Sequence, residues 1–431
     1  MLRLATLNYL SIGVFSVVYV LIVLRNLRRF RIPVWTIMMA GAVSMLFLGA
    51  IPLQEAYSAI NLDVIFFLLG MFSVVAAMDL SGLLEYLTLR MLELAKSPQR
   101  AFALVLFGMS VMSAFLVNDT LALIATPIML GLAKQMRIRP EVLLITLAMG
   151  VTVGSMVTPI GNPQNLLIAL STGIPNPIFD FLYYLLLPTI ACLIVTYLIL
   201  RLYYRKDLSA ASLEGFHAIP EESIKDAKLA KIAAWAGGIT VLGFFAVGVA
   251  RLLGVQGNFN LGTVSLLGAT IVFLASKRRR EIIKTVDWGI IIFFISLFIV
   301  MEGFWQSNAL QSLMTYLPAL DRANSASSLV TITISSLLFS QLLSNVPFVA
   351  VYMRVMQGAG FTGVDVEAWI MLAGASTLAG GLTLLGAASN VIILEEAESR
   401  GAGFGFVEFA KAGFLVTIPN ILILFFFLSV L

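Results

Sequence analysis

Apolar runs of about 20 residues, the length that crosses a bilayer as an α-helix, recur along the whole chain between short polar segments. Uninterrupted spans are predicted at 8–25, 33–52, 62–83, 178–201, 231–253, 260–276, 286–306 and 408–430. Two more apolar helices, 141–174 and 366–399, are each broken at mid-membrane depth by a polar sequence. The pattern therefore predicts an all-α polytopic membrane protein.

The two broken helices have related sequences. TVGSMVTPIGNPQNLLI and TLAGGLTLLGAASNVII align at a constant offset of 225 residues, which pairs Thr158 with Thr383 and Asn165 with Asn390. A break inside lipid leaves backbone N–H and C=O groups bare, and this is tolerated only where they are buried in protein or line a cavity. One such break is equally consistent with a packing kink, but two in matching places are typical of a secondary transporter's binding site.

Two remaining apolar segments, 101–135 and 326–357, carry a polar sequence at their centre. The first holds Asn118-Asp119-Thr120 and the second Ser344-Asn345-Val346-Pro347. Each segment is predicted to form a re-entrant hairpin, with both ends on one side of the membrane. Counting the broken helices, the chain then has about 10 spans of bilayer length and two hairpins.

Lys and Arg are distributed unequally between the predicted loops. The positive-inside rule places the Arg cluster at 25–31 in the cytoplasm. All 27 Lys and Arg residues then fall inside, except Arg3, Arg251, Arg322 and Arg354. Both termini are external in this topology.

An inverted repeat follows from the topology. Phe66-Phe67 matches Phe293-Phe294 at an offset of 227, and the two helices that carry these pairs cross the membrane in opposite directions. Matching halves of opposite orientation are a common architecture of secondary transporters. The predicted divisions are an extra N-terminal helix at 1–32, repeat one at 33–205, a cytoplasmic loop and linking helix at 206–259, and repeat two at 260–431.

Composition excludes several other classes of protein. Hydrophobic residues make up 60% of the chain, charged residues 12%, and the mean hydropathy is +1.00. The single cysteine, Cys192, excludes a disulfide framework, and the single histidine, His217, excludes most zinc and haem sites. No GxxxxGK[ST] sequence occurs, so transport would draw on an ion gradient or on a separate ATPase subunit. We expect no enzymatic activity, no cofactor and no nucleic-acid partner.

The polar sequences at the hairpin tips and helix breaks supply the chemistry of the predicted site. The free N–H groups of a half-helix attract anions, and the free C=O groups attract cations. Two Na⁺ cages of neutral oxygens are predicted, one at Asn118 and Asn165 and the other at Asn345 and Asn390. The full set of predicted ion- and substrate-binding residues is Asn118, Asp119, Thr120, Thr158, Gly161, Asn162, Asn165, Ser344, Asn345, Thr383, Gly386, Ser389 and Asn390.

Asp119 is the most informative single residue of the predicted site. It lies among apolar neighbours, and its match in the second repeat is Val346. An acid at membrane depth is costly and therefore marks a function, such as binding a cation or carrying a proton. The structural alternative is a capping Asp at the start of the hairpin's second helix.

The other acids near the breaks have less specific interpretations. Asp79 and Glu302 lie on matching helices and are interpreted as gates, structural partners or residues facing lipid headgroups. Glu395, Glu396 and Glu398 follow the second break and are interpreted as a solvated helix end.

The sequences NDTLALIATPI, TPIGNPQN, SNVPF and GAASN resemble those of the ion transporter superfamily. This group includes divalent anion:sodium symporters, citrate–metal permeases, arsenite permeases and sodium/proton antiporters of the NhaD type. In the symporters a Ser-Asn-Thr motif occupies each hairpin tip, whereas here Asp119 and Val346 depart from it. The Asn-Asp pair and LYYRKD at 202–207 are more similar to the arsenite permeases, which however lack GNPQN. The resemblance implies a homodimer with a scaffold, a transport domain and elevator-type alternation.

Together these features predict an ion-coupled transporter, driven by Na⁺ or H⁺, of a small anion or oxyacid. We expect it in the lipid bilayer of a prokaryotic inner or plasma membrane. The alternative within the class is efflux of arsenite or antimonite. An anion channel would need a continuous polar stripe, which the apolar helices beside each break argue against. An intramembrane enzyme would need a catalytic dyad or metal cluster, which Asp119 alone does not supply.

Overall fold

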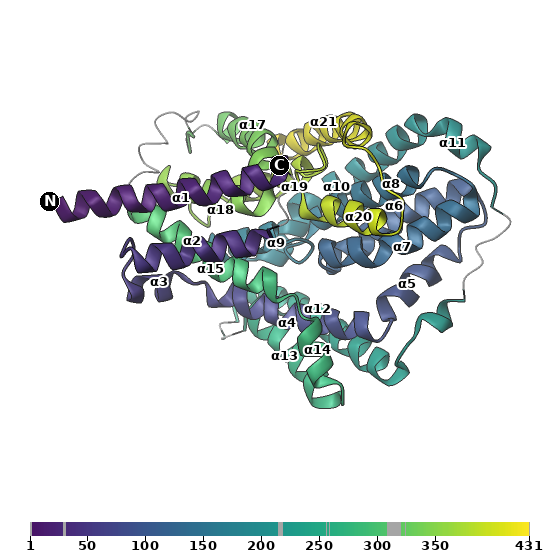
Figure 1. The fold of residues 1–431 in the computed structure, drawn as a ribbon, viewed down its shortest axis with the longest axis horizontal. Helices are drawn as coiled ribbons and strands as arrows, with labels where there is room; N and C mark the ends of the chain where they lie inside the picture. The colour runs from purple at the N-terminus through teal and green to yellow at the C-terminus, as the bar shows by residue number, and fades with distance from the viewer. Residues whose placement is uncertain are drawn as a thin grey trace.

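The protein is helical throughout the described residues (Figure 1). The structure, a computed structural model, describes residues 2–28, 32–213, 219–255, 257, 259–307, 320–323 and 325–430. His217 lies outside this part of the chain. Within it, eight helices are long and apolar enough to cross a membrane. The predicted class of an all-α multi-pass membrane protein is therefore confirmed.

Every predicted span and both predicted hairpins contain a helix. In chain order, the α-helices are α1 (Leu2–Arg28), α2 (Val34–Phe47), α3 (Leu53–Ala59), α4 (Leu62–Leu80), α5 (Leu83–Leu92), α6 (Pro98–Phe115), α7 (Asn118–Met136), α8 (Pro140–Gly154), α9 (Pro163–Ser171), α10 (Pro177–Tyr203), α11 (Arg205–Ala210), α12 (Ala227–Leu252), α13 (Leu261–Ala275), α14 (Arg279–Thr285), α15 (Trp288–Gln306), α17 (Ser325–Leu343), α18 (Asn345–Gly358), α19 (Val366–Ala379), α20 (Ala388–Ser399) and α21 (Phe406–Val430). Two 3₁₀ turns, η1 (Ser155–Val157) and η2 (Pro220–Ser223), complete the set.

The short helices α3, α5, α11 and α14 are not predicted from the sequence, because they lie between the apolar runs. Helix α5 shows how one arises. Helix α4 ends just before Gly82, which has a φ of 79°. Glycine adopts this left-handed conformation readily, so the chain can change direction here. The chain then starts a new helix that carries Glu85 and Arg90 among apolar residues.

Proline fixes the first residue of several helices. Pro98, Pro140, Pro163 and Pro177 begin α6, α8, α9 and α10. Proline is favoured there because the first N–H groups of a helix have no intrahelical partner and the ring sets a helical φ. At the first break, Pro163 thus marks where the second half-helix, α9, begins; α20, after the second break, begins at Ala388 without a proline.

Helices α6 and α7 form the first hairpin. The Ser110 hydroxyl donates to the Gly150 carbonyl at 2.8 Å, and the Ser113 hydroxyl donates to that of Val151 at 2.8 Å, so α6 runs parallel to α8. Helix α7 reaches α8 through a connection of a few residues and packs back along it. The tip of the hairpin therefore lies at the end of α8, where that helix breaks.

Matching helices pack in matching pairs. Helix α4 packs on α13, and the matching helices of the other repeat, α15 and α2, pack on each other in the same way. Likewise α7 packs on α20, and the matching helices α18 and α9 pack on each other. Each of the last two pairs joins a hairpin to the broken helix of the other repeat. Such reciprocal contacts between the repeats are expected when two related halves are arranged around a shared axis. The opposite orientation of the halves in a membrane, and the domain boundaries, remain predictions.

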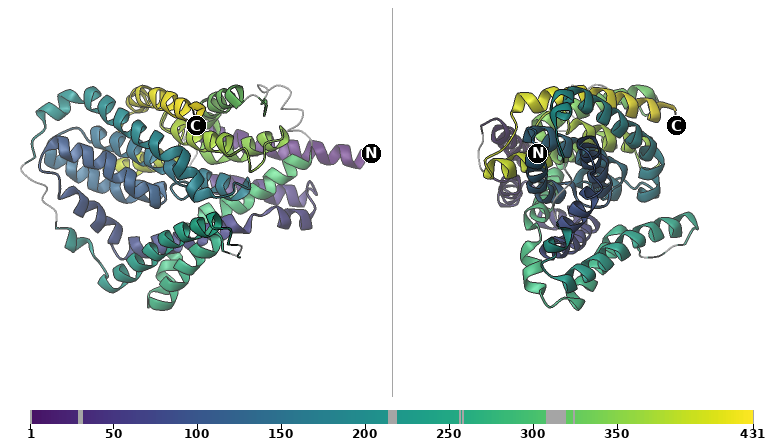
Figure 2. Two further views of the ribbon diagram at one scale, coloured as in Figure 1. Left: turned by 180° about the vertical axis from the view of Figure 1, so that it is seen from behind. Right: turned by 90° about the vertical axis from the view of Figure 1, so that its right-hand side faces the viewer.

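The helices form two groups that meet along the breaks. Helices α12, α13 and α14 lie on one side of the molecule, and α10, α17 and α21 lie on the other, in both figures (Figures 1 and 2). The hairpins and broken helices pack with α10 and α21, whereas α4 packs with α12 and α13. We call the α2, α4 and α12–α15 set the scaffold group and the α6–α9 and α17–α20 set the hairpin group.

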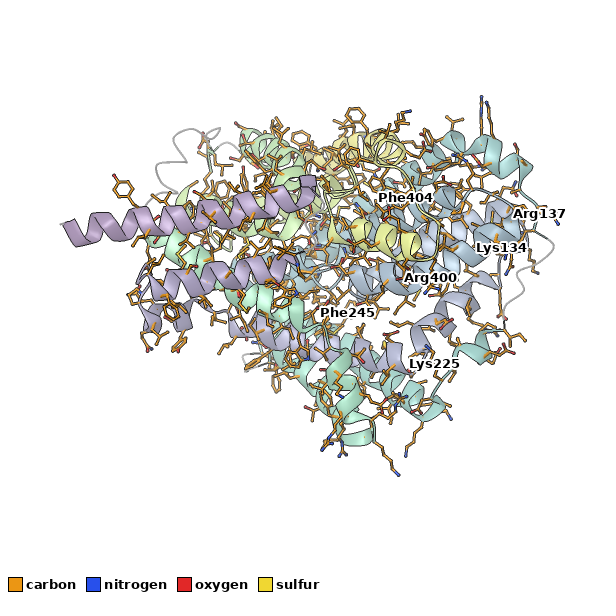
Figure 3. All side chains as sticks on the ribbon, in the orientation of Figure 1. Lys134, Arg137, Lys225, Phe245, Arg400 and Phe404 are labelled. Carbon is orange, nitrogen blue, oxygen red and sulfur yellow. The ribbon has the colours of Figure 1, made fainter. Side chains whose placement is uncertain are left out.

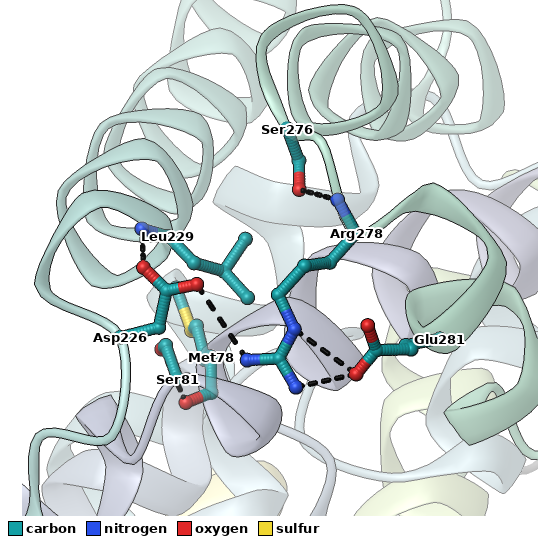
Figure 4. A network of polar contacts seen from close by, with 7 residues as sticks. All are labelled: Met78, Ser81, Asp226, Leu229, Ser276, Arg278 and Glu281. Carbon is teal, nitrogen blue, oxygen red and sulfur yellow. Dashed lines mark hydrogen bonds and ion pairs between the residues drawn. The ribbon is translucent and has the colours of Figure 1, made fainter.

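A polar network joins helix ends at one corner of the scaffold group (Figure 4). The Asp226 carboxylate caps α12 by accepting from the Leu229 N–H at 2.9 Å, and it pairs with Arg278 at 3.5 Å. Arg278 also pairs with Glu281. Figure 3 labels four cationic residues, Lys134, Arg137, Lys225 and Arg400, all on the side of the molecule away from the N-terminal end of α1. The cytoplasmic face stays a prediction from the positive-inside rule.

Cysteine labelling tests the predicted sidedness. Cys192 is fully buried, so a Cys192→Ala protein provides a silent background. Cysteines at Gln99 and Lys134, at the base of the first hairpin, are expected to react only from the cytoplasm. Cysteines at Ala326 and Ala359, at the base of the second, are expected to react only from outside. Reaction of one hairpin's two ends from opposite faces would refute the re-entrant topology.

Candidate functional site

The first break is held together by its own side chains. The Asn162 side chain caps α9 by accepting from the Asn165 N–H at 2.9 Å. The Asn165 amide donates to the carbonyls of Ser155, Met156 and Thr158, each at 3.2 Å. These bonds satisfy three of the carbonyls that the break would otherwise leave bare at membrane depth.

The second break repeats two of these bonds at the matching positions. The Asn390 amide donates to the Gly380 carbonyl at 2.8 Å and to the Thr383 carbonyl at 3.4 Å. Gln341, on the second hairpin, adds two bonds: its amide donates to the Ala379 carbonyl at 2.8 Å, and its oxygen accepts from the Thr383 hydroxyl at 2.8 Å. Asn165 and Asn390, predicted as equivalent from the sequence alone, thus close the two loops in the same way.

Each hairpin tip lies against a break. The Asn118 N–H, at the first tip, donates to the Gly161 carbonyl at 3.1 Å. At the second tip, a Cβ on Gly380 would come within 2.7 Å of the Asn345 amide nitrogen. Ser344 has a φ of 66°, which is uncommon outside glycine and marks backbone strain of the kind found at functional sites.

Several buried side-chain oxygens at the breaks have no hydrogen-bond partner among the described residues. At the second break these are Oδ1 of Asn345, Oδ1 of Asn390 and Oγ of Ser389. At the first break only Oδ1 of Asn118 among the predicted ligands is free, because Oδ1 of Asn165 accepts from the Thr377 hydroxyl at 3.2 Å. Buried polar atoms are nearly always paired in native proteins, so unpaired ones call for a ligand or water.

The two breaks therefore differ in how many oxygens they leave for a cation. Thr377 links the first break to the other repeat by bonding with Asn162 and Asn165. Its match in the first repeat, Thr152, is buried and has no partner in the part of the chain that the structure describes. The sequence did not indicate this difference, because Thr152 and Thr377 are the same residue type.

Gly161 provides a direct test of how tightly the first break is packed. A Cβ at this position would lie 2.5 Å from the Ser155 carbonyl oxygen and 2.8 Å from that of Ser113, and backbone atoms cannot move aside cheaply. Gly161→Ala is expected to lower stability by about 1 to 3 kcal/mol, as overpacking does. The matched control is Gly131→Ala, on α7, where a Cβ meets nothing within 4 Å. Thermal unfolding in detergent checks both, and equal melting temperatures would contradict the expectation.

Carboxylates surround a cavity that reaches the first hairpin tip, which we call the acidic cavity. It consists of two adjoining hollows of about 390 Å³ each, and Asp119, Asp287 and Glu395 line both. Asp79 and Glu396 line only the first hollow, together with Thr120, and Ser344 lines the second. Among the described residues, no Lys or Arg lines either hollow, so the cavity has the electrostatic potential of an acidic cleft.

The placement of Asp119 bears on the interpretation that it caps a helix. The residue before α7, Val117, makes no side-chain cap, and no hydrogen bond to a backbone N–H is present for the Asp119 carboxylate among the described residues. The Asp119 carboxylate therefore does not cap α7 through a hydrogen bond, although the first turn is a place where an acid stabilises a helix. Asp119 lies in the first turn of α7, partly exposed, with its side chain lining the acidic cavity.

Four acids of the cavity, Asp79, Asp287, Glu395 and Glu396, lie outside the predicted site. Glu395 is exposed, as expected for a solvated helix end, but the space it faces is the acidic cavity. Asp287 caps α15 by accepting from the Ile290 N–H at 3.2 Å. The signal available in the sequence lay one residue away, because Asn61, which caps the matching helix α4, matches Trp288 at the offset of 227, next to Asp287. No three His, Cys, Asp or Glu side chains of the described chain are arranged to hold a metal ion together.

A second cavity has a volume of about 180 Å³. The helices that line it match those of the acidic cavity, but each comes from the other repeat. The acidic cavity lies between α4, α7, α20 and the start of α15. The second cavity lies between α15, α18, α9 and the start of α4, where Asn61 takes the place of Asp287. We call it the Arg354 cavity, since Arg354 is the charged residue in its lining. Of the 13 predicted site residues, Asp119, Thr120 and Ser344 line the acidic cavity, and the others lie at the tips and breaks.

Comparison with known proteins assigns the family. Residues 19–374 match the family model described as "Citrate transporter". The chain belongs to the citrate transporter family. It is also 27% identical to an uncharacterized transporter of Mycobacterium tuberculosis, over 96% of each chain. The silicon efflux transporter LSI3 of Oryza sativa subsp. japonica is 24% identical, over 83% of this chain and 84% of that protein.

A solved structure supports the fold of this citrate transporter family member. The crystal structure of the YdaH transporter of Alcanivorax borkumensis, described as having an unusual topology, superposes with a TM-score of 0.59. The match covers 88% of this chain and 86% of that one, at 15% sequence identity. The chain is thus a multi-pass membrane transporter of the predicted superfamily.

Proposed function

We propose that this family member is an ion-coupled secondary transporter, driven by Na⁺ or H⁺, of a small oxyacid that is uncharged at neutral pH. One observation carries the proposal: two hairpin tips and two helix breaks meet at buried, unpaired amide oxygens, beside a cavity lined by carboxylates. Neutral amide and hydroxyl groups bind both small cations and the hydroxyl groups of an oxyacid, since each can donate or accept.

The charge of the acidic cavity restricts the substrate class. A free anion approaching Asp119, Asp287 and Glu395 meets like charges with no cation in the lining to offset them. Such a cleft repels anions and concentrates cations. An oxyacid that keeps its protons, such as silicic or arsenous acid, enters without this penalty. The silicon efflux transporter among the relatives is consistent with this substrate class.

Efflux of arsenite is the alternative within the same class, and the same lining favours it, because arsenous acid is uncharged at neutral pH. Citrate, the substrate in the family's name, carries several negative charges. It would fit the acidic cavity only with its charge offset, for example by a bound divalent cation. The substrate screen therefore includes silicic acid, arsenite and citrate.

We infer that transport proceeds by movement of the hairpin group against the scaffold group. Both cavities lie between these groups: α7 and α20 face α4 in one, and α18 and α9 face α15 in the other. A displacement of one group would enlarge one cavity while narrowing the other, which is the requirement of alternating access. The cavities differ in volume, about 390 Å³ for each hollow of the acidic cavity against about 180 Å³ for the Arg354 cavity.

A binding screen followed by flux tests the proposal. Purified protein is heated with silicic acid, arsenite, citrate or citrate plus Mg²⁺, each with and without Na⁺. A ligand present at 100 times its Kd is expected to stabilise the protein by about 2.7 kcal/mol. Stabilisation by an oxyacid, and its uptake into proteoliposomes under a Na⁺ or pH gradient, would support the proposal. Stabilisation by citrate alone would overturn the substrate class, and flux at channel rates would overturn the carrier.

A further inference from the structure

An ion pair at the edge of the Arg354 cavity joins the two helix groups; Arg354 lines the cavity, and Met301, next to Glu302 in the chain, lines it too. The Arg354 guanidinium, on α18, donates to Oε2 of Glu302, on α15, at 2.9 Å. The two side chains are 30% and 20% exposed, so the pair is partly shielded from water. The guanidinium also lies over the Trp305 ring, 5.7 Å from its centroid, a distance at which a cation and an aromatic face attract.

Further polar contacts fix the scaffold side of this pair. Gln306 donates to Oε1 of Glu302 at 3.2 Å and to Oε2 of Glu55 at 2.5 Å. The Glu302 carboxylate is therefore held by Arg354 on one oxygen and by Gln306 on the other. A bound carboxylate that already has its partners in place loses less side-chain entropy when the pair forms.

Among the described residues, the acidic cavity has no equivalent ion pair. At the offset of 227 that relates the hairpins and the helices before them, Glu302 matches Val75 and Arg354 matches Pro127. Val75 lines the acidic cavity, which is the larger one. Of the ion pairs in the described chain, the Arg354–Glu302 pair is the one that joins α15 to α18. The two repeats pack in similar ways. They differ in that, among the described residues, an ion pair joins the hairpin group to the scaffold group at the Arg354 cavity and none does so at the acidic cavity.

We propose that the Arg354–Glu302 pair is a lock that holds the Arg354 cavity narrow and favours the state in which the acidic cavity is open. Opening the Arg354 cavity separates α18 from α15 and breaks the pair. The equilibrium between the two states then includes the free energy of this pair, whereas opening or closing the acidic cavity breaks no such pair. The inference rests on the alternating movement of the two groups proposed above.

The test measures how fast reporter cysteines react in a Cys192→Ala background. Ser171→Cys reports on the Arg354 cavity and Thr285→Cys on the acidic cavity, since each side chain lines one of them. A membrane-impermeant methanethiosulfonate reagent is applied from either side of oriented vesicles. Glu302→Gln and Arg354→Gln are each expected to raise the reaction rate of the Ser171 reporter about fivefold, the shift that one partly exposed ion pair can hold, and to lower that of Thr285.

Three controls separate a lock from a general loss of structure. Arg322→Gln removes another ion pair, 2.7 Å long, that leaves α15 and α18 untouched, and it is expected to change neither rate. Arg354→Lys keeps the cation and is expected to stay near the parent rate. The exchanged pair, Glu302→Arg with Arg354→Glu, is expected to restore the low rate of the Ser171 reporter.

The outcomes distinguish the lock from the proposed function. The lock would be overturned if the reporter cysteines reacted at the same rates in Glu302→Gln as in Arg322→Gln. It would also be overturned if the protein with the exchanged pair stayed as reactive as the single variants. Arsenite and silicic acid flux is measured in the same vesicles. Absent flux in the Cys192→Ala parent would overturn the proposed substrates, while the reporter rates would still decide the lock.

Discussion

Asn345→Ala is expected to reduce transport about 100-fold while the protein still inserts and remains monodisperse. Asn345 is 4% exposed, and the variant removes its buried, unpaired amide oxygen beside the second break, where a coupling ion would bind. Loss of a buried polar ligand costs about 1 to 3 kcal/mol, and each 1.4 kcal/mol corresponds to about tenfold in a binding constant. Asn118→Ala, at the first tip, is expected to act in the same direction, since its Oδ1 is also unpaired. Flux into proteoliposomes under a Na⁺ gradient measures both.

Asn420→Ala is the matched control for these variants. Asn420 is fully buried on α21, its Oδ1 has no partner among the described residues, and its amide donates to the Thr196 hydroxyl at 2.9 Å. It therefore resembles Asn345 in burial but lies outside the tips and breaks. We expect Asn420→Ala to lower stability and to retain transport. If Asn345→Ala keeps near-normal flux with an unchanged ion dependence, the second cation cage is wrongly placed.

Asp119→Asn is expected to abolish uphill transport driven by a pH gradient and to leave exchange of substrate across the membrane intact. Asp119 faces the acidic cavity, makes no cap and has no counterpart in the second repeat, where Val346 takes its place. A carboxyl that binds a proton in one facing state and releases it in the other couples proton movement to substrate movement. The amide mimics the permanently protonated form, so the cycle continues without net proton transfer.

Two further measurements define the role of Asp119. Glu395→Gln removes a charge from the same cavity, and we expect it to keep uphill transport, because an exposed carboxylate there changes only the local field. If Na⁺ alone couples transport through neutral oxygens, Asp119→Asn would change the Na⁺ affinity modestly and leave Na⁺-driven uptake working. Unaltered uphill flux in Asp119→Asn under both gradients would remove Asp119 from the mechanism.

The membrane class, the helices and the composition of the site follow from local properties of the sequence. Apolar runs of bilayer length have few alternatives to helix, because every backbone polar group must be satisfied within the segment. Proline and asparagine at fixed positions, such as Pro163 and Asn162, set where half-helices begin. The match of Asn165 with Asn390 predicted two equivalent loops, and the structure has equivalent hydrogen bonds in both.

Contacts between distant segments decided the rest, because residue types alone do not specify which partners meet. Thr152 and Thr377 are identical and occupy matching positions, yet only Thr377 bonds across to the other repeat. The acidic cavity brings Asp119 and Asp287 together from helices far apart in the chain, so neither its existence nor its charge could be derived from one segment. Apolar periodicity specifies that a helix is buried in membrane or protein. Which cavity it lines depends on the packing of the two repeats, which only the tertiary structure determines.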